Sequence, residues 1–88
     1  MWTLDMTLDL LSHYHQRATY GAVGGILNVL PRSVMKGRSH NARHSWVVNK
    51  KTLEPTDYTT TECDPHLYER DAVLTNEKDL RRWLKNPK

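Results

Sequence analysis

The chain has 88 residues, which is enough for one domain with a small hydrophobic core. Its single cysteine excludes an internal disulfide framework, and no apolar run reaches the roughly 20 residues that a membrane-spanning helix needs. The formal net charge is +3, and its excess lies in residues 1–43, which hold five Lys/Arg against two Asp, whereas residues 44–88 hold eight charges of each sign. Because the N-terminus also lacks the basic-then-apolar order of a signal peptide, we expect a cytoplasmic protein with no membrane partner.

The first sixteen residues predict an amphipathic helix. Leu4, Leu8 and Leu11 recur on one face with a period near 3.6, and either Thr3 or Asp5 can cap the helix. We expect this segment to be the first helix of a three-helix core.

Residues 19–38 predict a helix-turn-helix motif. A short apolar helix follows Thr19, whose hydroxyl can cap it, and a turn at residues 28–30 separates it from a second helix that begins at Pro31. The outward face of that second helix is basic, as a DNA-reading helix requires, and carries Arg32, Lys36 and Arg38.

Two consecutive glycines interrupt the first helix of this motif. Gly24 and Gly25 each cost about 1 kcal/mol relative to alanine inside a helix. We therefore expect another helix or DNA to approach the chain closely at this point.

Two β-prone segments predict a hairpin after the helix-turn-helix. Residues 45–49 and 58–61 are the expected strands, joined by a turn-rich connection that carries Lys50 and Lys51.

A final helix is predicted from apolar residues at three- and four-residue spacing, namely Leu80, Trp83 and Leu84. The predicted fold class is α+β and mainly helical: one winged helix-turn-helix domain over residues 1–88, with a small β-hairpin wing and a C-terminal helix.

Three short motifs within residues 19–58 resemble a known family. They are Thr19-Tyr20-Gly21, Pro31-Arg32-Ser33-Val34, and Trp46-Val47-Val48-Asn49 followed by Tyr58. Together they resemble the C-terminal DNA-binding domain of alkylguanine-DNA alkyltransferases and the alkyltransferase-like proteins. The resemblance implies a helix-turn-helix docked in the minor groove, with Tyr20 against a phosphate and Arg32 in the base stack where a damaged guanine has flipped out. It also implies a candidate base pocket made by Asn41, Trp46 and Tyr58.

The chain departs from this family at the reactive centre. Ser45-Trp46 runs directly into Val47-Val48, so the Pro-Cys-His-Arg motif that holds the nucleophilic cysteine is missing. We therefore expect a non-catalytic protein that needs no cofactor.

The expected partner is duplex DNA, with damaged or flipped bases as the candidate target. Nine residues are predicted to contact it: Thr19, Tyr20, Arg32, Ser33, Lys36, Arg38, Arg43, Lys50 and Lys51. If five of these cations reached phosphates, the logarithm of affinity would fall with the logarithm of salt concentration with a slope of about −4 to −5.

Other functional classes remain as alternatives. A protein-interaction module would use the C-terminal part, with Tyr68 and Trp83 in a partner interface or a weak homodimer. Neighbouring carboxylates oppose a nucleophilic role for Cys63. A zinc site is disfavoured, because its candidate ligands are either too closely spaced or in a predicted loop: His13, His15, His40, His44 and Cys63.

Overall fold

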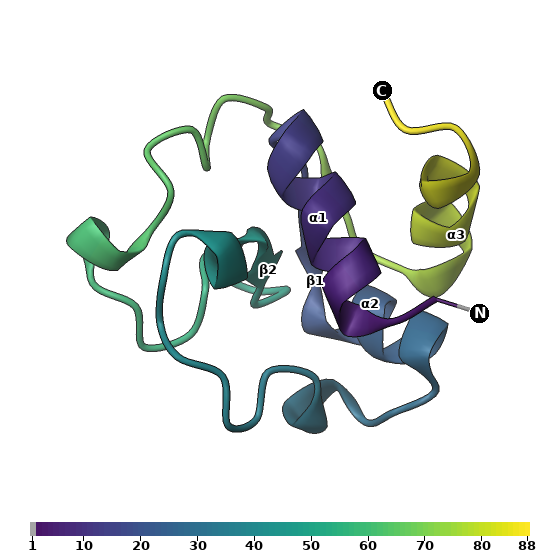
Figure 1. Ribbon diagram of the computed structural model, residues 1–88, viewed down its shortest axis with the longest axis horizontal. Coiled ribbons are helices and arrows are strands. Elements are labelled where there is room, and N and C mark those ends of the chain that lie inside the picture. Colours follow the sequence, from purple (N-terminus) through teal and green to yellow (C-terminus); the bar gives the residue numbers. More distant parts are fainter. Residues whose placement is uncertain (1) are drawn as a thin grey trace.

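Three helices and three short strands make up the fold in the computed structural model, which describes residues 2–88. In chain order the elements are α1 (Leu4–Tyr14), β1 (Arg17–Thr19), α2 (Tyr20–Leu27), β2 (Val47–Val48), β3 (Val73–Leu74) and α3 (Glu77–Lys85). Three 3-10 turns lie between them: η1 (Pro31–Ser33), η2 (Arg43–Trp46) and η3 (Thr60–Glu62). The α+β class is therefore confirmed (Figure 1). Within residues 2–88, none of the helices has the length and apolar character needed to cross a membrane.

The helix starts follow from local capping. The Thr3 hydroxyl accepts a hydrogen bond from the Met6 N–H at 3.1 Å, so of the two candidate caps of α1 the structure uses threonine. The Thr19 hydroxyl accepts from the Ala22 N–H at 3.2 Å and starts α2 as expected. Asn28 ends α2 in the left-handed region, with φ of 59°.

The sheet is parallel, with strand order β2-β1-β3. Ala18 at its centre pairs with Val47 on one side and Leu74 on the other. Parallel neighbours need a crossover connection, and here α2 and the turns after it link β1 to β2.

The predicted hairpin wing is therefore wrong. β2 pairs with β1 and not with residues 58–61, which contain no strand and lead into η3. Val47 and Val48 are both buried, as in parallel strands covered on two faces, whereas a wing strand alternates between buried and exposed residues. The chain leaves β2 through a tight turn in which the Asn49 side chain accepts a hydrogen bond from the Lys51 N–H at 2.8 Å.

The second helix of the predicted helix-turn-helix is much shorter than expected. Pro31 opens it as predicted, but the helix is only the 3-10 turn Pro31–Ser33, and isolated turns closed by the Lys36 and Arg38 N–H groups follow it. No side chain caps this turn, and Gly37 with φ of 78° lies where the helix would have continued.

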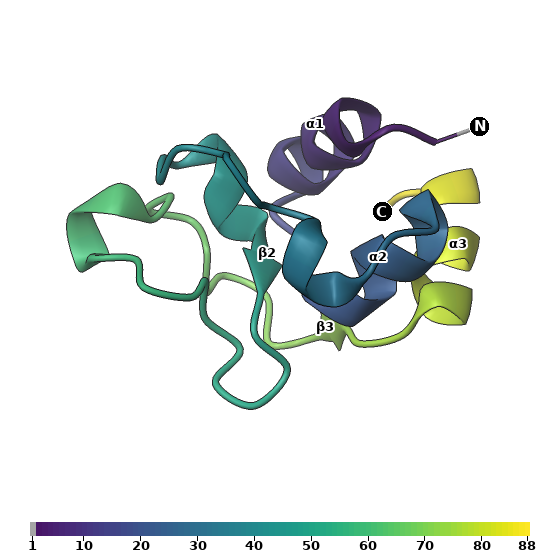
Figure 2. The same cartoon turned by 90° about the horizontal axis from the view of Figure 1, so that it is seen from below.

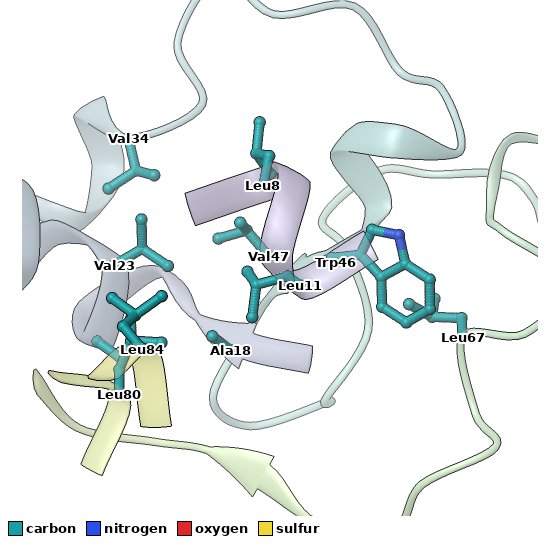
Figure 3. Close-up of a cluster of buried hydrophobic side chains, with 11 residues drawn as sticks. Leu8, Leu11, Ala18, Val23, Val34, Trp46, Val47, Leu67, Leu80 and Leu84 are labelled. Atoms are coloured by element: carbon teal, nitrogen blue, oxygen red, sulfur yellow. The ribbon is translucent and has the colours of Figure 1, made fainter. Parts of the chain in front are cut away.

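The core joins all three helices to the sheet. Figure 3 shows apolar side chains from α1, β1, α2 and α3 converging around Val23 and Val47, with Trp46 and Leu67 packed at one side. The buried set is Leu8, Leu11, Ala18, Ala22, Val23, Val34, Trp46, Val47, Leu67, Leu80 and Leu84. The chain between β2 and β3 runs as loops on the side of the sheet away from α3 (Figures 1 and 2).

A buried arginine holds this long connection in place. Arg17 in β1 is 6% exposed and donates hydrogen bonds to the carbonyl oxygens of Leu53 at 2.9 Å and Arg70 at 2.8 Å. Its guanidinium also lies 4.9 Å from the centre of the Tyr68 ring. The central strand thus anchors both ends of the loop region.

The glycine pair permits two close approaches, and the one at Gly25 is the expected approach of another helix. A Cβ on Gly24 would lie 2.7 Å from the Val29 carbonyl oxygen, and one on Gly25 would lie 2.6 Å from the Glu77 carboxylate of α3. The turn after α2 and the docking of α3 both depend on these missing side chains.

Gly24→Ala is expected to destabilise the domain by about 1–3 kcal/mol, because the neighbour at Gly24 is rigid backbone. Gly21→Ala is the matched control. Its Cβ would meet nothing closer than 4.0 Å, so we expect a change near zero or a gain of up to about 1 kcal/mol. Urea denaturation followed by circular dichroism measures both; equal effects of the two variants would contradict the packing role.

Candidate nucleic-acid interface

The carboxyl ends of the three strands meet around the start of α2. After β1 come Tyr20 and Gly21, after β2 come Asn49, Lys50 and Lys51, and after β3 comes Thr75; together with Pro31 these residues line a depression of about 490 Å³. Ligands of parallel α/β sheets commonly bind outside the carboxyl ends of the strands. The topology therefore places this depression where a binding site is expected.

A second depression of about 410 Å³ shares Tyr20 and Pro31 with the first. Arg32, Met35, Lys36 and Thr56 complete its lining. Four cations from two separate chain segments thus surround one tyrosine at a helix N-terminus. We call this region the Tyr20 surface: Tyr20, Gly21, Arg32, Lys36, Lys50 and Lys51.

The four cations of the Tyr20 surface have no carboxylate partner. Among residues 2–88, no ion pair within 4.0 Å involves Arg32, Lys36, Lys50 or Lys51. The first turn of α2 carries no acidic residue either, so the positive end of its dipole adds to the field. This arrangement attracts anions such as phosphate groups.

Tyr20 connects α2 to the loop after β2. Its hydroxyl oxygen accepts a hydrogen bond from the Thr56 N–H at 3.1 Å. A phenol can accept one hydrogen bond and still donate its own proton. The Tyr20 hydroxyl can therefore be held in position by the protein and donate to a bound phosphate.

Other predicted contact residues have structural roles. Thr19 is 1% exposed, and its hydroxyl caps α2 and donates to the Thr75 carbonyl oxygen at 3.3 Å. Ser33 is exposed in η1, where its N–H donates to the Leu30 carbonyl oxygen at 2.9 Å. Thr19 thus organises the Tyr20 surface from beneath it.

Arg38 and Arg43 are paired with α1. Each guanidinium lies 3.3 Å from the Asp5 carboxylate, and Arg43 also lies 2.7 Å from that of Asp9. The hydrogen bond from Arg43 lowers the pKa of Asp5, and the one to Asp9 raises the pKa of Arg43. Both arginines are thus partly neutralised within the chain, unlike the four cations of the Tyr20 surface.

The candidate base pocket is not assembled. Trp46 is fully buried in the core, whereas the Asn41 side chain accepts a hydrogen bond from the His44 N–H at 2.9 Å in an exposed turn. Tyr58 lines a cavity of about 40 Å³ with Tyr20 and another of about 200 Å³ with Cys63, and neither Asn41 nor Trp46 lines either of them. Burial raises the pKa of the Tyr58 hydroxyl.

The C-terminal aromatic residues proposed for a partner interface also have contacts within the chain. Trp83 packs edge-on against Tyr14 with ring centres 5.8 Å apart, and Tyr68 faces the Arg17 guanidinium. Burial, with the charges of Glu54 and Glu62, raises the pKa of the Cys63 thiol. That shift agrees with the expectation that Cys63 is a poor nucleophile.

Comparison with known proteins gives no relative: the chain matches no family model, no curated protein and no solved structure. The resemblance to the alkyltransferase family therefore stays a prediction based on residues 19–58.

Three lining residues of the first depression that sequence reasoning missed come from the sheet topology. Gly21, Asn49 and Thr75 line the depression only because their strands are parallel neighbours. The signal was present in the short apolar runs 47–48 and 73–74, each followed by a polar residue. Such runs are typical of buried parallel strands.

Proposed function

We propose that this chain binds duplex DNA through the Tyr20 surface and catalyses no reaction. One observation carries the proposal: four cations without carboxylate partners converge on Tyr20 and the N-terminus of α2, at the carboxyl ends of a parallel sheet. Cations beside a helix N-terminus can contact the phosphates of a nucleic-acid backbone.

In this proposal α2, the turn at residues 28–30 and η1 act as a shortened helix-turn-helix. Tyr20 and Arg32 line the same depression, which supports the roles that the family resemblance implies for them. Tyr20 would contact a phosphate, and the exposed Arg32 would probe the groove or the base stack. The protein would work in the cytoplasm, where its single thiol stays reduced.

The test is a fluorescence-anisotropy titration of the protein against a duplex with one alkylguanine and against its undamaged twin, at two salt concentrations. The proposal expects saturable binding to both duplexes that weakens as salt rises. Tighter binding to the damaged duplex that Arg32→Ala abolishes would identify a damage sensor. Absence of binding to both duplexes at low salt would contradict the proposal.

Asp5→Asn is expected to strengthen DNA binding. Asp5 contacts both Arg38 and Arg43, and Arg38 lies beside Tyr20 in the small cavity that also contains Tyr58. Releasing Arg38 adds a cation next to the Tyr20 surface, so the salt slope should become steeper by about one. The amide keeps the shape of the residue, and Thr3 still caps α1.

Asp71→Asn is the control for this variant. It changes net charge by the same amount at an exposed residue that forms no ion pair among residues 2–88. Anisotropy over a salt series measures both variants. If Asp71→Asn steepened the slope as much as Asp5→Asn, net charge would explain the effect and the release of Arg38 would not.

A further inference from the structure

Two histidines and a glutamate lie together on a part of the molecule that the Tyr20 surface does not include. His15 follows α1, whereas His66 and Glu69 belong to the turns between η3 and β3. One ligand atom from each of the three residues lies within 4.8 Å of the others. Figure 1 shows the green segment of the connection reaching the C-terminal end of α1.

Both imidazoles face the same carboxylate. His15 Nδ1 lies 2.9 Å from Glu69 Oε1, and His66 Nδ1 contacts Glu69 Oε2. Each nitrogen is therefore aimed at a different oxygen of one carboxylate. Two imidazole nitrogens and a carboxylate oxygen are a ligand set that Zn²⁺ uses in open, three-residue protein sites.

Several local features hold the first ligand in place. His15 adopts the left-handed region with φ of 54°, which a non-glycine residue rarely does. Its ring stacks on the buried Trp46, with centres 5.6 Å apart, and on His66, with centres 4.5 Å apart. The core therefore fixes the plane of the His15 ring.

The other two ligands share a short turn. The Asp64 side chain accepts a hydrogen bond from the His66 N–H at 2.8 Å, and the Glu69 N–H donates to the His66 carbonyl oxygen at 3.1 Å. The backbone thereby presents both side chains toward α1. All three side chains are one-third to one-half exposed, so a hydrated ion can reach them, and the exposed His66 ring can tilt toward it while His15 stays in place.

We propose that His15, His66 and Glu69 bind one divalent first-row transition metal ion, with Zn²⁺ as the reference ligand. The ion takes the place of the hydrogen bonds that now join the imidazoles to the carboxylate. Bonds of about 2.0–2.1 Å draw the three groups closer, and water fills the remaining position. Because the ligands come from distant parts of the chain, the ion cross-links α1 to the connection before β3.

The test is isothermal titration of the full chain with Zn²⁺ at pH 8, an alkaline pH chosen because Glu69 raises the pKa of His66 and a metal-binding imidazole must be neutral. We expect one ion per chain, and at saturation a melting temperature higher by roughly 10 °C. His66→Ala and Glu69→Ala should each weaken binding at least tenfold. Both residues are exposed and outside the core, so the variants should fold.

Two further variants keep the result interpretable. His15→Asn retains a residue that tolerates the left-handed region and removes the imidazole, so it should also weaken binding at least tenfold. His13→Ala removes an exposed histidine outside the cluster and should leave affinity unchanged. Equal Zn²⁺ affinity of wild type, His66→Ala and Glu69→Ala, or no saturable binding to wild type, would overturn the proposal.

Discussion

Replacing Arg32, Lys36, Lys50 and Lys51 by alanine is expected to remove most of the salt-dependent affinity for DNA. Each cation that reaches a phosphate contributes about −0.9 to the salt slope, so the wild-type slope should be about −3 to −4. Wild-type affinity should then fall by roughly 100-fold between 50 and 200 mM salt, whereas that of the variant should change little. Anisotropy with an undamaged duplex over a salt series measures both slopes.

A matched variant on α3 separates location from net charge. Lys78, Arg81, Arg82 and Lys85 line a different depression, and replacing all four removes the same charge as the first variant. We expect the α3 variant to keep a slope of about −3 to −4. Equal loss in both variants would mean that DNA responds to overall charge, and the Tyr20 surface would lose its assigned role.

Trp46→Ala is expected to cost about 3–5 kcal/mol of unfolding free energy, the largest stability effect of any substitution considered. The indole is fully buried against Leu67 and the His15 ring, so its removal leaves a large cavity in the core (Figure 3). A domain of this size has roughly 4–13 kcal/mol of stability in total, so the variant should be marginally folded at best.

Trp46→Phe is the companion variant. The indole Nε1–H of Trp46 is buried without a hydrogen-bond partner, so phenylalanine removes an unsatisfied donor together with part of the ring. We expect a smaller loss than for alanine, and thermal denaturation measures both. A stable Trp46→Ala protein that had lost only its binding to damaged DNA would instead support a role in a base pocket.

Local signals predicted where α1, α2 and η1 begin. Threonine caps, the helix-starting Pro31 and the glycine pair each act through neighbours in sequence or through the size of one side chain, and the structure confirms them. α3 is likewise capped by a local side chain, since that of Asn76 accepts a hydrogen bond from the Asp79 N–H at 2.8 Å.

The sheet could not be predicted in the same way. Its strands have only two or three residues, too few to show a period, and their pairing joins segments that are distant in the chain. The sequence predicts no strand at residues 17–19, although all three of these residues are buried. Because no strand is predicted at residues 17–19, the next β-prone segment along the chain becomes the expected partner of residues 45–49.

Only part of the candidate site could be predicted from the sequence, because the rest also depends on contacts between segments that are distant in the chain. Sequence identified the cations, but which of them lack carboxylate partners is decided by tertiary contacts. Arg38 and Arg43 lie beside Asp5 and Asp9 only because α1 packs next to η2. The histidine cluster depends equally on the connection between η3 and β3 folding back onto α1.

The most direct test of the central claim is a titration of ¹⁵N-labelled protein with a short undamaged duplex, followed by amide chemical shifts. The proposal predicts the largest shifts at Tyr20, Gly21, Arg32, Lys36, Lys50 and Lys51, and smaller ones at Thr75, which lines the first depression. Amides of α3 and of residues 64–69 should stay unchanged. Shifts confined to those segments, or none at DNA concentrations that saturate anisotropy, would contradict DNA binding by the Tyr20 surface.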